Sequence, residues 1–217
     1  ADLADLAERS ADPPAVRAAL DRLDAGTVDL LAASPRLAEA VVTVVAASRS
    51  AARLVQTDPA ALDVLAHLDD PADGPDIPPD RADRPDGSDG SEGLDSSDVP
   101  DGPGRAGGSG REDGTDVAAA ADVEALVRAK RLVQLRITAR DLLRRATLEE
   151  TTAALADLAA AVLDAAVRLT GPADGLAVVG MGKLGGRELN YASDVDVMFV
   201  GGDARRAHPL LPGRFRG

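Results

Sequence analysis

The chain has 217 residues, no cysteine and a formal net charge of −13 at pH 7. The lack of cysteine excludes disulfides and thiolate metal sites, and no run of about 18 apolar residues is present that would span a membrane. Ala, Leu and Val supply most of the apolar residues, with two Phe, one Tyr and no Trp, so we expect a core of aliphatic helices. The acidic N-terminus lacks the layout of a signal peptide, and we expect a cytoplasmic protein.

Residues 1–68 are predicted to form a region of short helices. One helix is expected to start at Pro13-Pro14, and Ser34 is expected to cap another that has Pro35 at its first position. The run 36–55 is predicted to continue as a helical stretch, and Asp58-Pro59 to start a further short helix. Apolar residues on or near one face of the long stretch are Leu37, Val41, Val44, Val45 and Leu54.

The acidity of the chain is concentrated in residues 69–116. This segment holds 15 acidic and 4 basic residues, half of the prolines and nearly half of the glycines. It has almost no large apolar residue, so burial cannot offset the entropy of ordering it. We predict a disordered acidic insert, which means that the net charge says little about the folded part.

Residues 117–170 are predicted to form an antiparallel helical hairpin. Apolar residues recur at helical spacing from Val123 to Ile137, and this helix is expected to end near Arg144-Arg145. Thr147 followed by Glu150 three residues later is typical of a capping box, which predicts the start of a second helix.

Residues 171–217 show a change from helix to strand. Gly171-Pro172 breaks the helical pattern, and short apolar runs at 176–179 and 195–200 predict two strands joined by a glycine-rich loop. The loop is too short for a parallel crossover, so we expect the strands to be neighbours in an antiparallel or mixed sheet.

The loop and the second strand carry the candidate chemistry. Asp194 and Asp196 lie two residues apart, which places both carboxylates on one face of a strand. Neighbouring carboxylates repel each other unless a cation such as Mg²⁺ lies between them. Upstream, Gly185 and Gly186 allow the backbone to approach a phosphate closely. The combination is typical of nucleotidyltransferases.

The run GMGKLGGRELNYASDVDVMFV, residues 180–200, closely resembles the signature of the glutamine synthetase adenylyltransferase/deadenylylase family. Its ELNY portion is more similar to the N-terminal, adenylyl-removing half of that family than to the adenylyl-adding half. Residues 135–142 and 34–65 also resemble the family's helices.

This resemblance implies an α+β fold, in which a helical N-terminal region leads into the start of a polymerase-beta-like mixed sheet. It also implies phosphorolysis of adenylyl-tyrosine on glutamine synthetase to ADP, with a PII-type signalling protein as regulator of the intact enzyme. Asp194 and Asp196 would bind Mg²⁺, and nucleotide or phosphate would contact the loop at Gly185, Gly186, Ser193 and Lys183. No nucleic acid or membrane partner is implied.

Other residues of this region are expected to be structural. Asn190 would orient the loop through side-chain hydrogen bonds, Tyr191 would pack, and Arg187 would form an ion pair or face solvent. From the preceding helix, Arg136, Arg140 and Asp141 would bind one another or support the site.

Two alternatives remain open. Residues 180–185 also satisfy the Gly-x-Gly-x-x-Gly pattern of dinucleotide-binding folds, but the short loop and the Asp-x-Asp pair disfavour that interpretation. The strand expected to carry a third carboxylate does not follow, and the ending RRAHPLLPGRFRG does not resemble the family. The chain is therefore also consistent with a truncated, inert fragment or a helical binding module.

Overall fold

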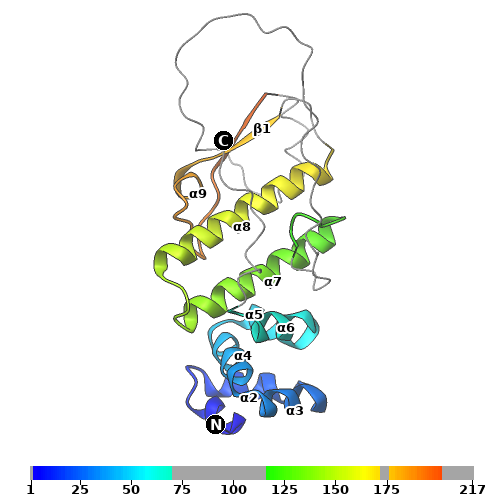
Figure 1. The fold of residues 1–217 in the computed structure, drawn as a ribbon, viewed down its shortest axis with the longest axis vertical. Coiled ribbons are helices and arrows are strands. Elements are labelled where there is room, and N and C mark those ends of the chain that lie inside the picture. Colours follow the sequence, from blue (N-terminus) through cyan, green and yellow to red (C-terminus); the bar gives the residue numbers. More distant parts are fainter. Residues whose placement is uncertain (1, 70–115, 172–175, 202–217) are drawn as a thin grey trace, which may run out of the picture.

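A computed structural model of the chain describes residues 2–69, 116–171 and 176–201. The described residues form an α+β structure that is mostly helical, with one small sheet. In Figure 1 the elements are stacked along the long axis, with the N-terminal helices at one end and the strands at the other. The elements are α1 Leu3–Glu8, α2 Pro13–Leu20, α3 Ala25–Ala33, α4 Pro35–Ala47, α5 Arg49–Thr57, α6 Ala60–Ala66, α7 Val123–Leu142, α8 Leu148–Leu169, β1 Ala177–Gly180, α9 Gly182–Gly185 and β2 Val197–Val200.

The predicted acidic insert lies almost entirely outside the described residues, and so does the segment after residue 201. The disorder predicted for residues 69–116 therefore stays a prediction. So does the division of the chain into units at residues 68, 116 and 170.

The predicted helix starts are confirmed. Helix α2 begins at Pro13, and the Asp12 carboxylate before it accepts a hydrogen bond from the backbone N–H of Ala15. The capping box of α8 is complete: Thr147 accepts from the Glu150 N–H, and the Glu150 carboxylate accepts from the Thr147 N–H at 2.7 Å. Ser34 occupies the N-cap position of α4, although its side chain makes no capping hydrogen bond.

The continuous helical stretch predicted over residues 36–55 is wrong. The chain breaks at Ser48, where α4 ends in an extended residue with φ −149°. The Ser48 hydroxyl then accepts a hydrogen bond from the Ala51 N–H and caps α5. A serine can satisfy free N–H groups at a helix start, so it makes a turn between two helices as favourable as continuation.

Two clusters of buried side chains hold the fold together. The first joins α1–α6 to one side of α7, and the second joins the other side of α7 to α8, α9 and the loop that follows α9. In α7, Leu132 and Leu135 belong to the first cluster, whereas Val133 and Ile137 belong to the second. Helix α7 thus packs against both clusters, and it connects the N-terminal helices to the candidate site.

Polar contacts reinforce the same junction. Arg128 of α7 binds Asp58 with two hydrogen bonds of 2.7 and 2.8 Å, and this hydrogen bonding holds the pKa of Asp58 below its usual value. Farther along α7, Arg136 and Arg140 donate to the carbonyl oxygen of Leu68, the latter at 2.7 Å. The cations expected to support the site instead bind the segment that follows α6.

The two strands pair antiparallel, as the short loop predicts. Ala177 lies opposite Val200, and Gly180 lies opposite Val197. Strand β2 begins two residues later than expected, so Asp194 and Asp196 precede the strand rather than lie in it. Within the described ranges the sheet has only these two strands, and the nucleotidyltransferase-like mixed sheet stays a prediction.

In the parts of the chain that the structure describes, no single helix is both long and apolar enough to cross a membrane. Helices α3 and α4 meet the length and composition only as a pair, and they are bent by 117° at their junction.

Candidate functional site

The candidate site is the connection between β1 and β2. After β1 the chain turns through the short helix α9, passes along an irregular loop and returns to β2 (Figure 1). The Met181 N–H donates to the Asp196 carbonyl at 2.9 Å, which extends the pairing of the strands by one hydrogen bond. The start of α9 and the residues just before β2 therefore lie side by side.

Gly182 and Asp196 meet at this point. The φ of Gly182 is +53°, a conformation that favours glycine. A Cβ atom added to Gly182 would lie 3.2 Å from a carboxylate oxygen of Asp196, so the carboxylate approaches the backbone closely. Gly182 was not among the predicted site residues. The Gly-x-Gly spacing of residues 180–182 is the sequence signal that could have identified it.

The two carboxylates are exposed. Neither the Asp194 nor the Asp196 carboxylate has a hydrogen bond or an ion pair with another described residue. Within the described residues no group of three or more potential protein ligands surrounds a common metal position. Mg²⁺ in enzymes is commonly held by one or two carboxylates together with substrate phosphates and water. The two carboxylates are therefore chemically suitable ligands for this ion. Metal binding stays a prediction.

Gly185 and Gly186 have a clear structural role. Their N–H groups donate to the carbonyl oxygens of Met181 and Gly182, at 3.1 and 2.9 Å, within the turn of α9. A Cβ atom on Gly185 would lie only 2.6 Å from the carbonyl oxygen of Gly180, so α9 packs directly on the end of β1. Contact of these glycines with phosphate stays a prediction, and donation from these N–H groups would require the turn to open.

The two other predicted phosphate contacts, Lys183 and Ser193, have different surroundings. Lys183 is exposed in α9, and its ammonium group has no partner among the described residues. The Ser193 hydroxyl donates to the Asn190 side-chain oxygen at 2.8 Å and accepts from the Asn190 N–H. The same Asn190 oxygen accepts from the Ala192 N–H, which confirms the predicted orienting role of Asn190.

The loop is fastened to both long helices. Leu184 and Leu189 are buried in the second core cluster, and Arg187 forms an ion pair with Asp157 of α8 at 2.6 Å. Arg187 has φ 56°, a left-handed conformation that this bidentate contact helps to maintain. The Tyr191 hydroxyl donates to Asp141 of α7 at 2.9 Å. Asp141 therefore supports the site from the helix, as expected.

The environment of Tyr191 raises its pKa to about 12. Partial burial is the first cause, and the hydrogen bond to the Asp141 carboxylate is the second, because both favour the protonated hydroxyl. The raised value means that the stabilisation from this hydroxyl is fully present below about pH 10 and is lost as the pH rises toward 12.

Tyr191 is the single tyrosine of a chain without tryptophan, so its ionisation can be followed by absorbance at the tyrosinate band. We expect a midpoint of about 12 in the folded chain and a midpoint near 10 in urea. Asp141→Asn should lower the folded midpoint, because it removes the negative charge. A folded midpoint near 10, or one unchanged by Asp141→Asn, would contradict the contact.

Comparison with known proteins finds a family that this region matches. Residues 114–208 match the family described as glutamate-ammonia ligase adenylyltransferase, which confirms the resemblance seen in residues 180–200. The predicted resemblance of residues 34–65 lies outside this match and stays a prediction. No solved structure matches the chain significantly.

Curated proteins named bifunctional glutamine synthetase adenylyltransferase/adenylyl-removing enzyme are similar to part of the chain. That of Streptomyces avermitilis is 50% identical over 98 residues, which are 42% of this chain and 10% of the relative. That of Streptomyces coelicolor is 50% identical over 92 residues, or 39% and 9%, and that of Ralstonia nicotianae is 41% identical over 105 residues, or 39% and 11%. The chain thus spans about a tenth of the length of the curated relatives it matches.

Proposed function

We propose that this chain, whose residues 114–208 match the glutamate-ammonia ligase adenylyltransferase family, contributes to an adenylyl-removing site that acts on glutamine synthetase. The observation that supports this is the exposed pair Asp194 and Asp196, whose carboxylates have no protein partner among the described residues. Its second member lies against the glycine turn of α9. The ELNY sequence before the pair favours removal over addition of the adenylyl group.

The proposed reaction is a phosphorolysis. An oxygen of inorganic phosphate attacks the phosphorus of the adenylyl group, the bond from phosphorus to the tyrosine oxygen breaks, and ADP leaves while the tyrosine oxygen takes a proton. Bound Mg²⁺ would neutralise phosphate charge and orient the attacking oxygen. Asp194 and Asp196 would hold the ion, while Lys183, Gly185, Gly186 and Ser193 would position the phosphate groups.

The partners proposed for the intact protein follow from the same family. Glutamine synthetase would be the substrate, a PII-type protein would regulate the reaction, and a second half would use ATP for the reverse modification. These partners belong to a protein about ten times as long as the matched segment.

Incubation of the chain with adenylylated glutamine synthetase, phosphate and Mg²⁺ should release ADP. Asp194→Asn and Asp196→Asn should each slow the release on the order of 100-fold or more, since each removes a charge that holds the metal. Asp29→Asn, which changes an exposed carboxylate of α3, is the matched control and should leave the rate unchanged.

Binding of Mn²⁺, followed by electron paramagnetic resonance, provides a second measurement that needs no turnover. The chain should bind Mn²⁺, and Asp196→Asn should weaken that binding. If the chain neither binds the ion nor releases ADP, the proposal fails for this chain and the interpretation as an inert fragment is correct. Transfer from ATP without phosphate-dependent removal would instead assign the adding activity.

A further inference from the structure

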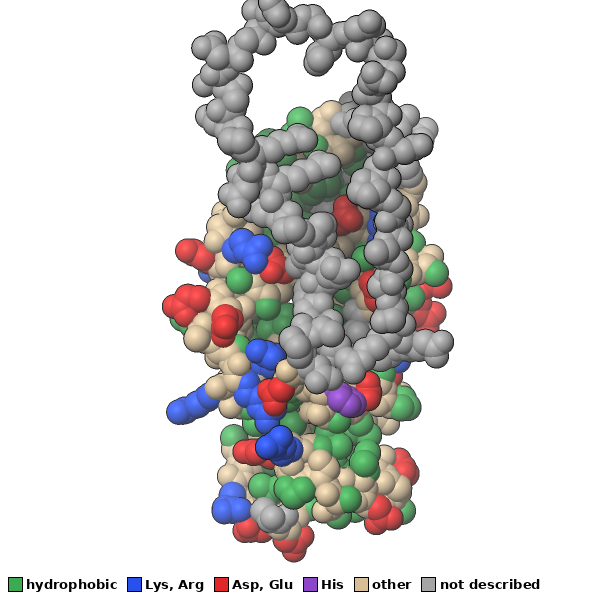
Figure 2. Space-filling view, viewed as in Figure 1, with side chains coloured by type: hydrophobic (Ala, Val, Ile, Leu, Met, Phe, Trp, Pro, Cys, Tyr) green, Lys and Arg blue, Asp and Glu red, His purple; other side chains and the backbone are tan. Residues whose placement is uncertain are grey.

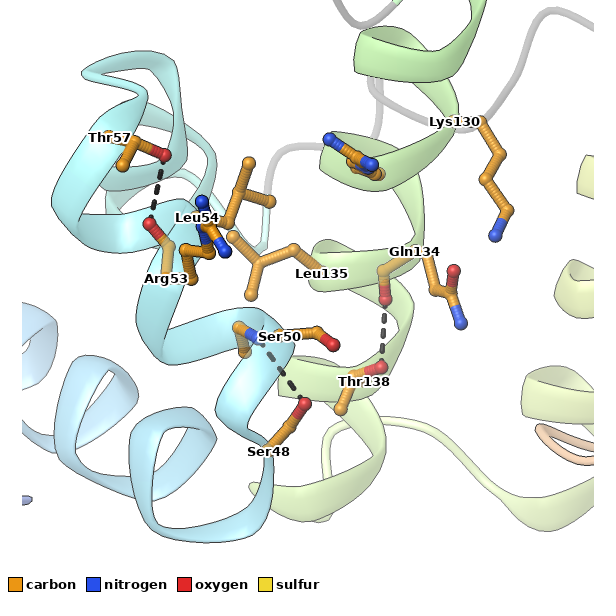
Figure 3. Close-up of a pocket in the computed structure, with 11 residues that line it drawn as sticks. Ser48, Ser50, Arg53, Leu54, Thr57, Lys130, Gln134, Leu135 and Thr138 are labelled. Atoms are coloured by element: carbon orange, nitrogen blue, oxygen red, sulfur yellow. Dashed lines mark hydrogen bonds between the residues drawn. The ribbon is translucent and has the colours of Figure 1, made fainter. Parts of the chain in front are cut away.

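Away from the candidate site, an open cavity of about 630 Å³ lies between α5 and α7. Figure 3 shows Arg53 and Leu54 extending from α5 toward Leu135 of α7. The described residues that line this cavity all come from α5, its N-cap and α7, and none comes from the connection between β1 and β2. The cavity is therefore separate from the carboxylate pair.

The lining of this cavity is positively charged. Arg53, Lys130 and Arg131 contribute three cations, and the described lining residues include no Asp or Glu. None of the three cations forms an ion pair or hydrogen bond with another described side chain. Asp58, which directly follows α5, is already occupied by Arg128. Neighbouring cations repel one another, and a bound anion would offset this repulsion.

Helical spacing arranges these cations. Arg131 and Leu135 are four residues apart in α7 and so share the face directed at α5, while Lys130, Gln134 and Thr138 form the adjacent row. In Figure 3, Lys130 and Gln134 extend from the other side of α7 relative to Arg53. Arg53 and Arg131 are thus the central pair, and Lys130 lies at the rim.

Hydrogen-bond donors accompany the charges. The Ser48 hydroxyl accepts from the Ala51 N–H and so keeps its own proton for a ligand, and Ser50 is exposed with a free hydroxyl. Thr57 and Thr138 instead donate to carbonyl oxygens of their own helices. Donors from serine and arginine match the acceptor oxygens of a phosphate group.

The floor of the cavity is apolar. Ala51 and Leu135 are buried, and Leu54 is half-buried beside them. Inorganic phosphate alone would leave most of the 630 Å³ unfilled, whereas ligand sites of about 300–1,000 Å³ are the usual size for small organic molecules.

We propose that this cavity binds a small organic phosphate, such as a nucleoside phosphate. Arg53 and Arg131 bind its phosphate groups, Lys130 adds charge at the rim, and the organic part lies against Leu54 and Leu135. This inference does not depend on the proposed adenylyl-removing activity, since no residue of that site takes part.

The test is isothermal titration calorimetry of the full chain with ATP in EDTA, which removes divalent ions and with them metal-dependent binding at the carboxylate pair. We expect ATP to bind, with an affinity that falls as salt is added. Arg53→Gln and Arg131→Gln should each weaken binding about 10-fold or more, the usual effect of losing a hydrogen bond to a charged group. Both side chains are exposed, so folding should persist, and circular dichroism checks it.

A matched variant defines specificity. Arg36→Gln removes the same charge from an exposed position on α4, and it should not change ATP affinity more than about twofold. Tripolyphosphate, which has the same number of phosphate groups as ATP, should bind more weakly than ATP because it lacks the organic part.

Several results would overturn the proposal. They are the absence of ATP binding, retained binding in the Arg53→Gln/Arg131→Gln double variant, and an equal loss in Arg36→Gln. Tripolyphosphate that binds as tightly as ATP would exclude a role for the apolar floor. Binding of polyglutamate in place of ATP would assign the cavity to an acidic protein partner.

Discussion

Leu132→Ala is expected to lower the free energy of unfolding by about 2–5 kcal/mol, the range for a buried leucine truncated to alanine. Leu132 is 0% exposed and lies in the first core cluster, where α7 packs on α4 and α6. The surrounding helices are held by further contacts on their other faces, so they can close the resulting cavity only in part.

Urea unfolding followed by circular dichroism measures this effect. Leu148→Ala is the matched control, since it removes the same atoms from a side chain that is 72% exposed at the start of α8. We expect its effect to stay within about 0.5 kcal/mol. Similar losses for the two variants would mean that the junction of α7 with the N-terminal helices is not packed as described.

Local signals in the sequence predicted much of the helical structure. The capping box of Thr147 and Glu150 and the proline at the start of α2 act over three or four residues, so they can be recognised without knowledge of the fold. Ser48 was the exception. A serine inside an apolar run fits both a helix interior and an N-cap, so the local sequence alone does not select the break.

Helix α7 shows why periodicity alone did not predict the core. The apolar residues that mark this helix include Val123, which is 59% exposed, and Leu126 and Leu132, which face different clusters. A helix between two cores is apolar on two sides, and spacing cannot assign each side to its partner. Which apolar residue faces which cluster depends on the positions of the other helices.

The structure of the candidate site was likewise predicted only where it depends on neighbouring residues in the sequence. The sequence predicted the order of strand, glycine turn and carboxylate pair, since these features are local and adjacent. It did not predict the contacts of Arg187 with Asp157 or of Leu184 with the second core, because these join residues far apart in the chain, 30 positions in the case of the ion pair. Nor did it predict the cationic cavity, whose two walls lie about 75 residues apart in the chain.

Gly185→Ala is expected to destabilise the connection between β1 and β2 by about 1–3 kcal/mol, as extra atoms do in a well-packed region. The added Cβ atom would lie 2.6 Å from the backbone carbonyl oxygen of Gly180, and neither backbone can move without disturbing the turn of α9 or the end of β1. Hydrogen exchange of the amide groups in β1 and α9 should become faster, while exchange in α4 should not change.

Gly186→Ala provides the contrast that separates packing from ligand binding. Its φ is −81°, which suits alanine, and its Cβ atom would meet the nearest backbone oxygen at 3.4 Å, a tolerable contact. We expect less than about 0.5 kcal/mol of destabilisation. If Gly186→Ala folds normally but loses phosphate-dependent ADP release, close approach of a phosphate to the turn is the remaining reason for a glycine there. Equal destabilisation by both variants would contradict the packing of α9 on β1, and the role of Gly185 would then have to be sought in the ligand.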